Sequence, residues 1–114
     1  MHRLCSLSDL TPGEGLRVDS VAPPVAVFLA EDGTVHAIDD TCTHQDASLA
    51  EGWLEDGAVE CPLHESRFCL RSGVPDGGPA RGAVRVHRAE VVDGEVLVEL
   101  STAAPCLPPG VVSA

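Results

Sequence analysis

The dipeptides Asp32-Gly33 and Asp93-Gly94 each separate two short Val-rich runs, and this arrangement constrains the fold most. An Asp-Gly pair between alternating apolar runs is the strongest short-range signal for a β-hairpin. With eleven Gly, nine Pro, two Phe and one Trp in 114 residues, the chain is predicted to be a single all-β domain with a core of Val, Leu, Ala and Ile. The expected strands cover residues 3–7, 15–20, 24–30, 34–39, 84–92 and 95–100, the first two around a Thr-Pro-Gly turn.

Between the two hairpins, residues 40–80 form a segment rich in Gly, Pro, Cys and His. A segment of this length is too long to be an idle loop in a compact domain. We therefore expect an inserted subdomain at residues 40–80 that carries the function, with one short helical turn at residues 45–51. The end of the chain, residues 103–114, contains three Pro and is expected to lie on the surface or to be disordered.

The inserted segment contains four candidate metal ligands in two short motifs. A Cys-Thr-His motif occupies residues 42–44 and a Cys-Pro-Leu-His motif occupies residues 61–64, with sixteen residues between them. Two Cys and two His suit tetrahedral Zn²⁺, and they also suit a [2Fe–2S] cluster with two Cys on one iron and two His on the other. A zinc finger usually pairs like ligands, whereas each motif here offers one of each kind, which favours the cluster. The candidate ligands are Cys42, His44, Cys61 and His64.

These motifs, extended to residues 61–68, resemble the Rieske signature of Cys-x-His followed by Cys-x-x-His. Residues 71–73 and the closing hairpin resemble Rieske ferredoxins of bacterial ring-hydroxylating dioxygenase systems, such as those for carbazole, biphenyl and naphthalene. The resemblance covers residues 3–100. It implies an antiparallel, β-sandwich-like basal domain with the cluster-binding subdomain on top. It also implies one [2Fe–2S] cluster, with His44 and His64 at an exposed tip.

The resemblance implies that the chain carries single electrons from a flavin-containing reductase to a terminal oxygenase. A Rieske oxygenase also needs a domain with a mononuclear iron held by two His and a carboxylate, and 114 residues leave no room for one. The chain is therefore expected to be an electron-transfer component and not an enzyme. Two alternatives stay open, namely a Rieske small subunit of another redox enzyme such as nitrite reductase, and a zinc-stapled binding module.

Two departures from the respiratory type of Rieske protein are informative. Ala47 and Leu63 stand where that type has the two cysteines of a disulfide, so that disulfide cannot form. Ser66 matches a Ser that hydrogen-bonds a cluster sulfur, but Phe68 replaces a Tyr that does the same. Because hydrogen bonds to sulfur stabilise the reduced state, we expect a potential near the low end of the range of about −150 to +300 mV.

The formal net charge is −11, there is no Lys, and the charges are unevenly placed. Residues 31–65 contain ten acids and no Arg, whereas residues 67–88 contain five Arg and one acid. Nucleic acid is a poor partner for such a chain. The acids, including Asp46 and Glu65 beside the motifs, are read either as a solubilising surface or as a docking face for a basic partner.

No run approaches the roughly 18 apolar residues of a membrane span, and the first ten residues lack the apolar core of a secretory signal. We expect a cytoplasmic monomer that docks transiently. The remaining thiols and imidazoles lack partners at ligand spacing and are expected to be structural, namely Cys5, Cys69, Cys106, His2, His36 and His87. Cys69 is expected beneath the cluster loop, and Trp53 is expected to fill the core rather than to shield the cluster.

Overall fold

The computed structural model describes residues 1–43, 47–62, 66–76 and 82–106. Within these residues, nine strands and two short 3-10 turns make up the regular structure, so the predicted all-β class is confirmed. The strands are β1 (His2–Ser6), β2 (Gly15–Val18), β3 (Val25–Leu29), β4 (Val35–Asp39), β5 (Trp53–Glu55), β6 (Ala58–Glu60), β7 (Arg67–Cys69), β8 (Val86–Val92) and β9 (Glu95–Glu99), and the 3-10 turns are η1 (Leu7–Asp9) and η2 (Leu49–Glu51). No helix among the described residues is long and apolar enough to cross a membrane.

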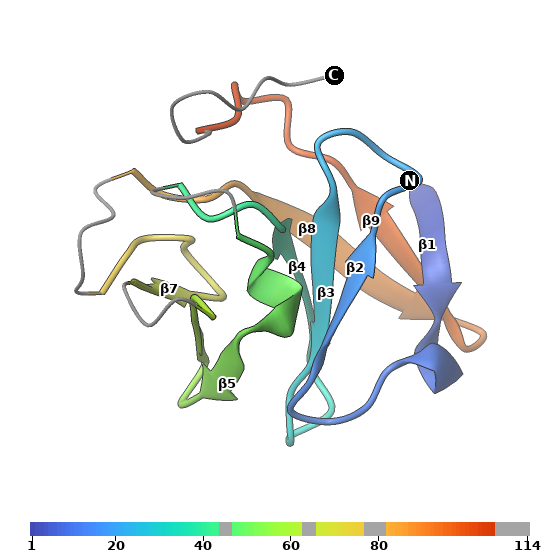
Figure 1. Ribbon diagram of the computed structural model, residues 1–114. Helices are drawn as coiled ribbons and strands as arrows, with labels where there is room; N and C mark the ends of the chain where they lie inside the picture. The colour runs from blue at the N-terminus through green and yellow to red at the C-terminus, as the bar shows by residue number, and fades with distance from the viewer. Residues whose placement is uncertain (44–46, 63–65, 77–81, 107–114) are drawn as a thin grey trace.

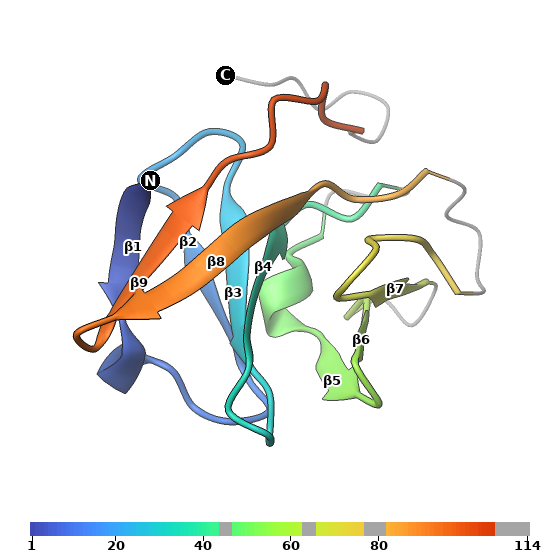
Figure 2. The same cartoon turned by 180° about the vertical axis from the view of Figure 1, so that it is seen from behind.

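The six strands expected from the sequence form one antiparallel sheet with the order β1-β9-β8-β4-β3-β2. β8 changes its partner along its length, because Val86 and His87 pair with β4 while Arg88–Val92 pair with β9. A strand shared in this way turns the corner between two packed sheets, and Figures 1 and 2 show the resulting curled sheet. The strands around the Thr-Pro-Gly turn do not pair with each other, since β1 pairs with β9 and β2 with β3.

β3 is buried on both of its faces. Val25 and Val27 pack inside the curled sheet, in a cluster that includes Val96 of β9. Ala26 and Phe28 point to the opposite side, into a second cluster that lies between β3 and the segment after β4. Because alternate side chains of a strand enter different cores, this strand needs the uninterrupted apolar run that the sequence shows.

A second, three-stranded antiparallel sheet, β5-β6-β7, follows η2 and was not predicted. Figure 1 shows it on the other side of η2 from the six-stranded sheet. β5 and β6 are joined by Asp56 and Gly57, which both have positive φ, at 50° and 75°. This geometry is that of the tight Asp-Gly hairpin turn, so the sequence contained a third hairpin signal of the kind used for the first two.

The two sheets are held close together where glycine allows backbones to meet. A Cβ placed on Gly15 of β2 would lie 2.7 Å from the carbonyl oxygen of Ala50 in η2 and 2.7 Å from the Phe28 ring. Gly73, at φ +73°, leaves no space for a side chain against the Val84 carbonyl, and its own carbonyl accepts the Val84 N–H at 2.9 Å. These contacts fix η2 and the end of the small sheet against the larger one.

Candidate metal centre

The first motif begins directly after β4. Cys42 is fully buried, and its backbone N–H donates to the carbonyl of Ala47 at 3.0 Å. Thr41 and Ser48 form an antiparallel bridge on either side of this contact. The chain therefore leaves β4, turns back on itself around Cys42, and enters η2 with both ends of the loop fixed.

The second motif follows β6, and its loop is closed in the same way. Cys61 is fully buried, and its backbone N–H donates to the carbonyl of Ser66 at 2.7 Å. In both loops, then, a buried cysteine bonds to the carbonyl five residues later. His44 and His64 lie outside the described residues, so the structure places two of the four candidate ligands.

The two cysteines belong to one cluster of packed, buried side chains. Phe68 and Leu49 are members of the same cluster and are completely excluded from solvent. All five cysteines lie in described residues, and none of them forms a disulfide. Two buried thiols that enter one packed cluster from different loops are the soft donors that an iron–sulfur centre requires, so the described donor set fits a cluster.

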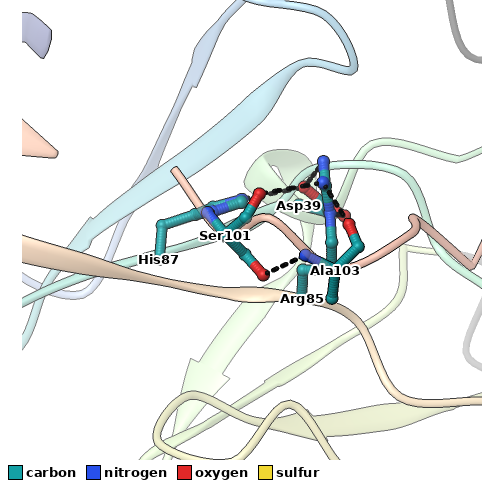
Figure 3. A network of polar contacts seen from close by, with 5 residues as sticks. All are labelled: Asp39, Arg85, His87, Ser101 and Ala103. Carbon is teal, nitrogen blue, oxygen red and sulfur yellow. Dashed lines mark hydrogen bonds and ion pairs between the residues drawn. The ribbon is translucent and has the colours of Figure 1, made fainter. Parts of the chain in front are cut away.

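A polar network at the end of β4 was missed in the sequence analysis (Figure 3). The Asp39 carboxylate accepts Arg85 Nε at 2.8 Å and Arg85 Nη2 at 3.2 Å, and it lies 2.9 Å from His87 Nε2. His87 Nδ1 accepts the Ser101 N–H at 2.9 Å, and Arg85 Nη1 donates to the carbonyl of Ala103 at 2.9 Å. The network ties β4 and β8 to the segment that follows β9.

The environment of Asp39 keeps its carboxylate ionised. Burial raises the pKa of Asp39, but the hydrogen bonds from His87 and Arg85, with the positive charge of Arg85, outweigh burial and hold the pKa below its usual range. The side chain of Asp39 is 3% exposed and that of His87 is 0% exposed. A buried carboxylate of this kind is stable only while its donors stay in place.

The segment after β9 returns to the first motif. Thr43, which follows Cys42, donates from its hydroxyl to the carbonyl of Gly82 at 2.7 Å. Cys106 lies against the same glycine, so closely that a Cβ on Gly82 would meet its sulfur. Cys106 therefore lies beside the start of the first loop. Residues 107–114 lie outside the described residues.

A model of the Rieske [2Fe–2S] domain matches residues 1–88 of the chain. The chain belongs to the Rieske [2Fe–2S] domain family. Membership implies one Rieske-type [2Fe–2S] cluster, which agrees with the two buried thiols described above. The family named from the sequence motifs is thereby confirmed.

Known Rieske proteins resemble this domain over most of its length. The 3-phenylpropionate/cinnamic acid dioxygenase ferredoxin subunit of Escherichia coli strain K12 is 40% identical over 108 residues, covering 92% of this chain and all of the relative. The ferredoxin in a complex of reduced oxygenase and oxidized ferredoxin of carbazole 1,9a-dioxygenase superposes with a TM-score of 0.78 at 39% identity, covering 86% of this chain and all of that one. A putative NADH-dependent nitrite reductase small subunit from Mycobacterium tuberculosis has a TM-score of 0.75 at 28% identity, covering 89% and 96%.

Two expectations for single residues of the Rieske domain are wrong. Trp53 does not fill the core but is 51% exposed, because the alternation of β5 turns its neighbour Leu54 inward against the buried cluster. Cys69 is not part of the buried core beneath the cluster loop; Phe68 and Leu70 on either side of it are. Both residues lie in or beside strands of three residues, where the sequence does not reveal which face is buried.

The other thiols and imidazoles play no part in a metal group among the described residues. Cys5 is buried in the cluster inside the curled sheet, while Cys106 is exposed. His87 is the buried network residue described above, and His36 is half-buried. Burial, followed by the positive charge of Arg71, lowers the pKa of His36. The sequence assigned structural roles to these residues, but it gave no sign of the partners of His87.

Proposed function

We propose that this chain is an electron-transfer ferredoxin that receives single electrons from a flavin-containing reductase and passes them to a terminal ring-hydroxylating oxygenase. Its Rieske cluster would be held by Cys42 and Cys61 on one iron and by His44 and His64 on the other. Residues 40–80 would form the cluster-binding unit on the basal sheet. The chain itself would catalyse no substrate chemistry.

The observation that carries this proposal is the matched closure of the two cysteine loops. Each buried cysteine donates its N–H to a carbonyl five residues later, at 3.0 Å for Cys42 and 2.7 Å for Cys61. Each loop also carries a histidine in its sequence motif. Paired, equivalent loops that each supply one thiolate and one imidazole suit a binuclear centre better than the like-with-like pairs of a zinc finger.

The residues around the cysteines set the conditions for electron transfer. When bound, the cluster accepts or releases one electron at a time. Cys42, Cys61 and Phe68 are completely buried, so water is kept away from the thiolate side. This low-polarity packing limits reorganisation of solvent when the charge changes, while the family resemblance puts the histidines at the tip, where a partner can approach.

The potential is proposed to lie near the low end of the Rieske range of about −150 to +300 mV. Phe68 supports this proposal, because its ring is packed in the same cluster as Cys42 and Cys61 and has no hydroxyl to donate to sulfur. Reduction also adds a negative charge to a protein with a formal net charge of −11. Both features make reduction harder.

Docking to the partners is proposed to be weak, fast and guided by charge. The relative in the carbazole 1,9a-dioxygenase complex binds its oxygenase, and the net charge of −11 favours encounter with basic surfaces. Asp46 and Glu65, which flank the histidine positions in sequence, would belong to such a docking face. The protein would act as a monomer in the cytoplasm.

The test is to purify the protein without oxygen and to determine iron, sulfide and zinc together with the EPR spectrum after reduction. Two irons and two sulfides per chain, and a rhombic signal with average g below 2, are expected. Cys42→Ser and Cys61→Ser should abolish the signal, whereas Cys69→Ser should keep it, because Cys69 lies in the same region but outside the buried cluster. A colourless protein with stoichiometric zinc would disprove the proposal.

A second candidate is the small subunit of a nitrite reductase. The resemblance to the M. tuberculosis protein, with a TM-score of 0.75, favours it, although the identity of 28% is below that to the dioxygenase ferredoxins. Reconstitution separates the two candidates. Product formation by reductase–oxygenase pairs supplied with this chain supports the first, and stable binding to a nitrite reductase large subunit supports the second.

A further inference from the structure

Asp40, the residue after β4, has a buried carboxylate that accepts hydrogen bonds from three groups, and its backbone carbonyl accepts a fourth. Its side chain is 3% exposed. Oδ1 accepts the Ser48 hydroxyl at 2.8 Å and the Ala50 N–H at 2.9 Å, and Oδ2 accepts Arg17 Nε at 3.2 Å. Its backbone carbonyl accepts the Leu49 N–H at 2.7 Å. A buried carboxylate needs this many donors to offset the loss of water.

Three of these donors lie at the far end of the first cysteine loop. Ser48, Leu49 and Ala50 are consecutive residues at the start of η2, and all three donate to Asp40. The loop that they close contains Cys42, only two residues after Asp40. One side chain therefore joins the two ends of the segment that presents this cysteine, and a shift of the carboxylate would move both ends.

The carboxylate is itself held in place from the basal sheet. Arg17 of β2 reaches Asp40 Oδ2 through Nε, and it also contacts Asp19 Oδ2 through Nη1 at 3.2 Å. The Asp40 N–H donates to the Pro24 carbonyl at 2.9 Å, just before β3. Through Asp40, the loop is thus anchored to β2 and β3 of the scaffold.

Asp39, the neighbour of Asp40, has a different role. Successive side chains of a strand point to opposite sides. The Asp39 carboxylate bonds Arg85 and His87 on the β8 side, away from the loop. The two adjacent buried aspartates therefore have different roles. Asp39 joins the scaffold to its C-terminal segment, and Asp40 joins the scaffold to the loop.

The geometry points to Asp40 as a positioning residue for the cluster, which joins the two ends of the loop that contains Cys42 and is itself oriented by Arg17. This inference rests on the proposed cluster function. It assigns to Asp40 no ligand role, since its oxygens are already occupied by Ser48, Ala50 and Arg17. Its effect on the cluster passes through the position of Cys42.

The test compares variants of the purified, cluster-loaded protein by EPR line positions and by the rate of iron loss to a chelator. Asp40→Asn keeps an oxygen for Ser48 and Ala50 but loses the ion pair, and it should shift the g values and speed iron loss several-fold. Asp40→Ala should increase the rate of iron loss further. Asp39→Asn is the matched control, because it removes an equally buried carboxylate at the adjacent position. It should lower thermal stability without shifting the g values.

Energetic coupling between Arg17 and Asp40 provides a second part of the test. Arg17→Met should speed iron loss in the wild-type background and add little in Asp40→Asn, where the ion pair is already broken. If Asp40→Ala does not fold, Ser48→Ala removes a single bond to Oδ1 and should give a smaller effect of the same kind.

The outcomes separate this inference from the proposed function. Wild-type g values and wild-type iron loss in Asp40→Asn would overturn the positioning role while leaving the Rieske cluster intact. Equal g shifts in Asp39→Asn and Asp40→Asn would also overturn it, because the effect would then be general destabilisation. A wild-type protein that contains zinc and gives no EPR signal would instead refute the proposed function.

Discussion

His87 Nε2 lies 2.9 Å from Asp39 Oδ1, and on its other side Nδ1 of the same ring accepts the N–H of Ser101. A backbone N–H can only donate, so Nδ1 carries no proton and Nε2 holds the ring proton, which it donates to Asp39. The imidazole is thereby inferred to be neutral, and the positive partner of Asp39 is Arg85. The pair links two strands, β4 and β8, at the place where β8 changes its pairing.

Asp39→Asn is expected to lower the free energy of unfolding by about 3 kcal/mol at neutral pH, because it leaves the guanidinium of Arg85 nearly buried without its counter-charge. The Arg85 side chain is only 14% exposed, so solvent cannot replace the carboxylate. Urea unfolding followed by circular dichroism measures the loss. Glu90→Gln is the surface control, since its partner Arg88 is 68% exposed, and it should cost less than about 1 kcal/mol.

The stabilisation from Asp39 should depend on pH in one direction. The folded-state pKa of Asp39 lies below its usual range, so the unfolded chain takes up a proton at this carboxyl more readily than the folded one. Its contribution is therefore complete above the unfolded pKa of about 3.9 and is lost as pH falls through the folded-state pKa. In assays from about pH 5 to 7, the difference in unfolding free energy between wild type and Asp39→Asn should be constant. Below about pH 4 this difference should shrink. A difference that grows on acidification would contradict this sign.

Phe68→Tyr is expected to raise the midpoint potential, because a hydroxyl at this buried position can donate to a cluster sulfur and stabilise the reduced state. A hydrogen bond worth about 1 kcal/mol corresponds to roughly 40 mV for one electron. Phe28→Tyr is the matched control, since Phe28 is fully buried in the same cluster but comes from β3. A redox titration in which both variants keep the wild-type midpoint would remove Phe68 as a cause of low potential.

Gly15→Ala is expected to cost about 1–3 kcal/mol through overpacking, because the new methyl group would lie 2.7 Å from the Ala50 carbonyl oxygen. Since η2 directly follows the first cysteine loop, the variant should also lose iron faster. Gly33→Ala meets nothing within 4 Å and suffers only from its φ of +88°, at about 1–2 kcal/mol. It should keep the wild-type rate of iron loss, and equal rates in the two variants would count against the close approach of η2.

Cys69 is expected to react with iodoacetamide faster than Cys5. Hydrogen bonds from Ser72 lower the pKa of the Cys69 thiol, whereas burial raises the pKa of Cys5. Thiolate is the reactive form, so Ser72→Ala should slow the alkylation of Cys69 and leave that of the exposed Cys106 unchanged. Mass spectrometry of the labelled peptides after brief exposure measures each rate; unchanged labelling of Cys69 in the variant would show that Ser72 does not activate it.

Local signals were sufficient to locate the strands of the large sheet, but not their order. The hairpin at Asp93-Gly94 depends on residues within a few positions of one another, and the structure has β8 and β9 where they are expected. The ligand role of the two motif cysteines stays a prediction. The same kind of signal, Asp56-Gly57, was present for the small sheet. The strands that flank it are three residues long, which is too short for an alternating pattern to identify them.

The roles of the two aspartates could not be obtained in this way. Asp39 meets His87 48 positions away, and Asp40 meets Arg17 23 positions away. Pairing at such separations is decided by how the strands are ordered in the sheet, and a single sequence contains no record of that order. Trp53 was misplaced for a related reason, since the register of β5 against β6 decides which face of β5 is covered.

The burial of β3 on both of its faces has a consequence for how the protein unfolds. Val27 and Phe28 are neighbours in the chain, yet they fill separate interiors, one under the curled sheet and one beneath the cysteine loops. Because both residues belong to one strand, disruption of either core displaces a side chain from the other. We therefore expect heating to bleach the protein and melt it in one step, with no folded, colourless stage between the red-brown ferredoxin and the denatured chain.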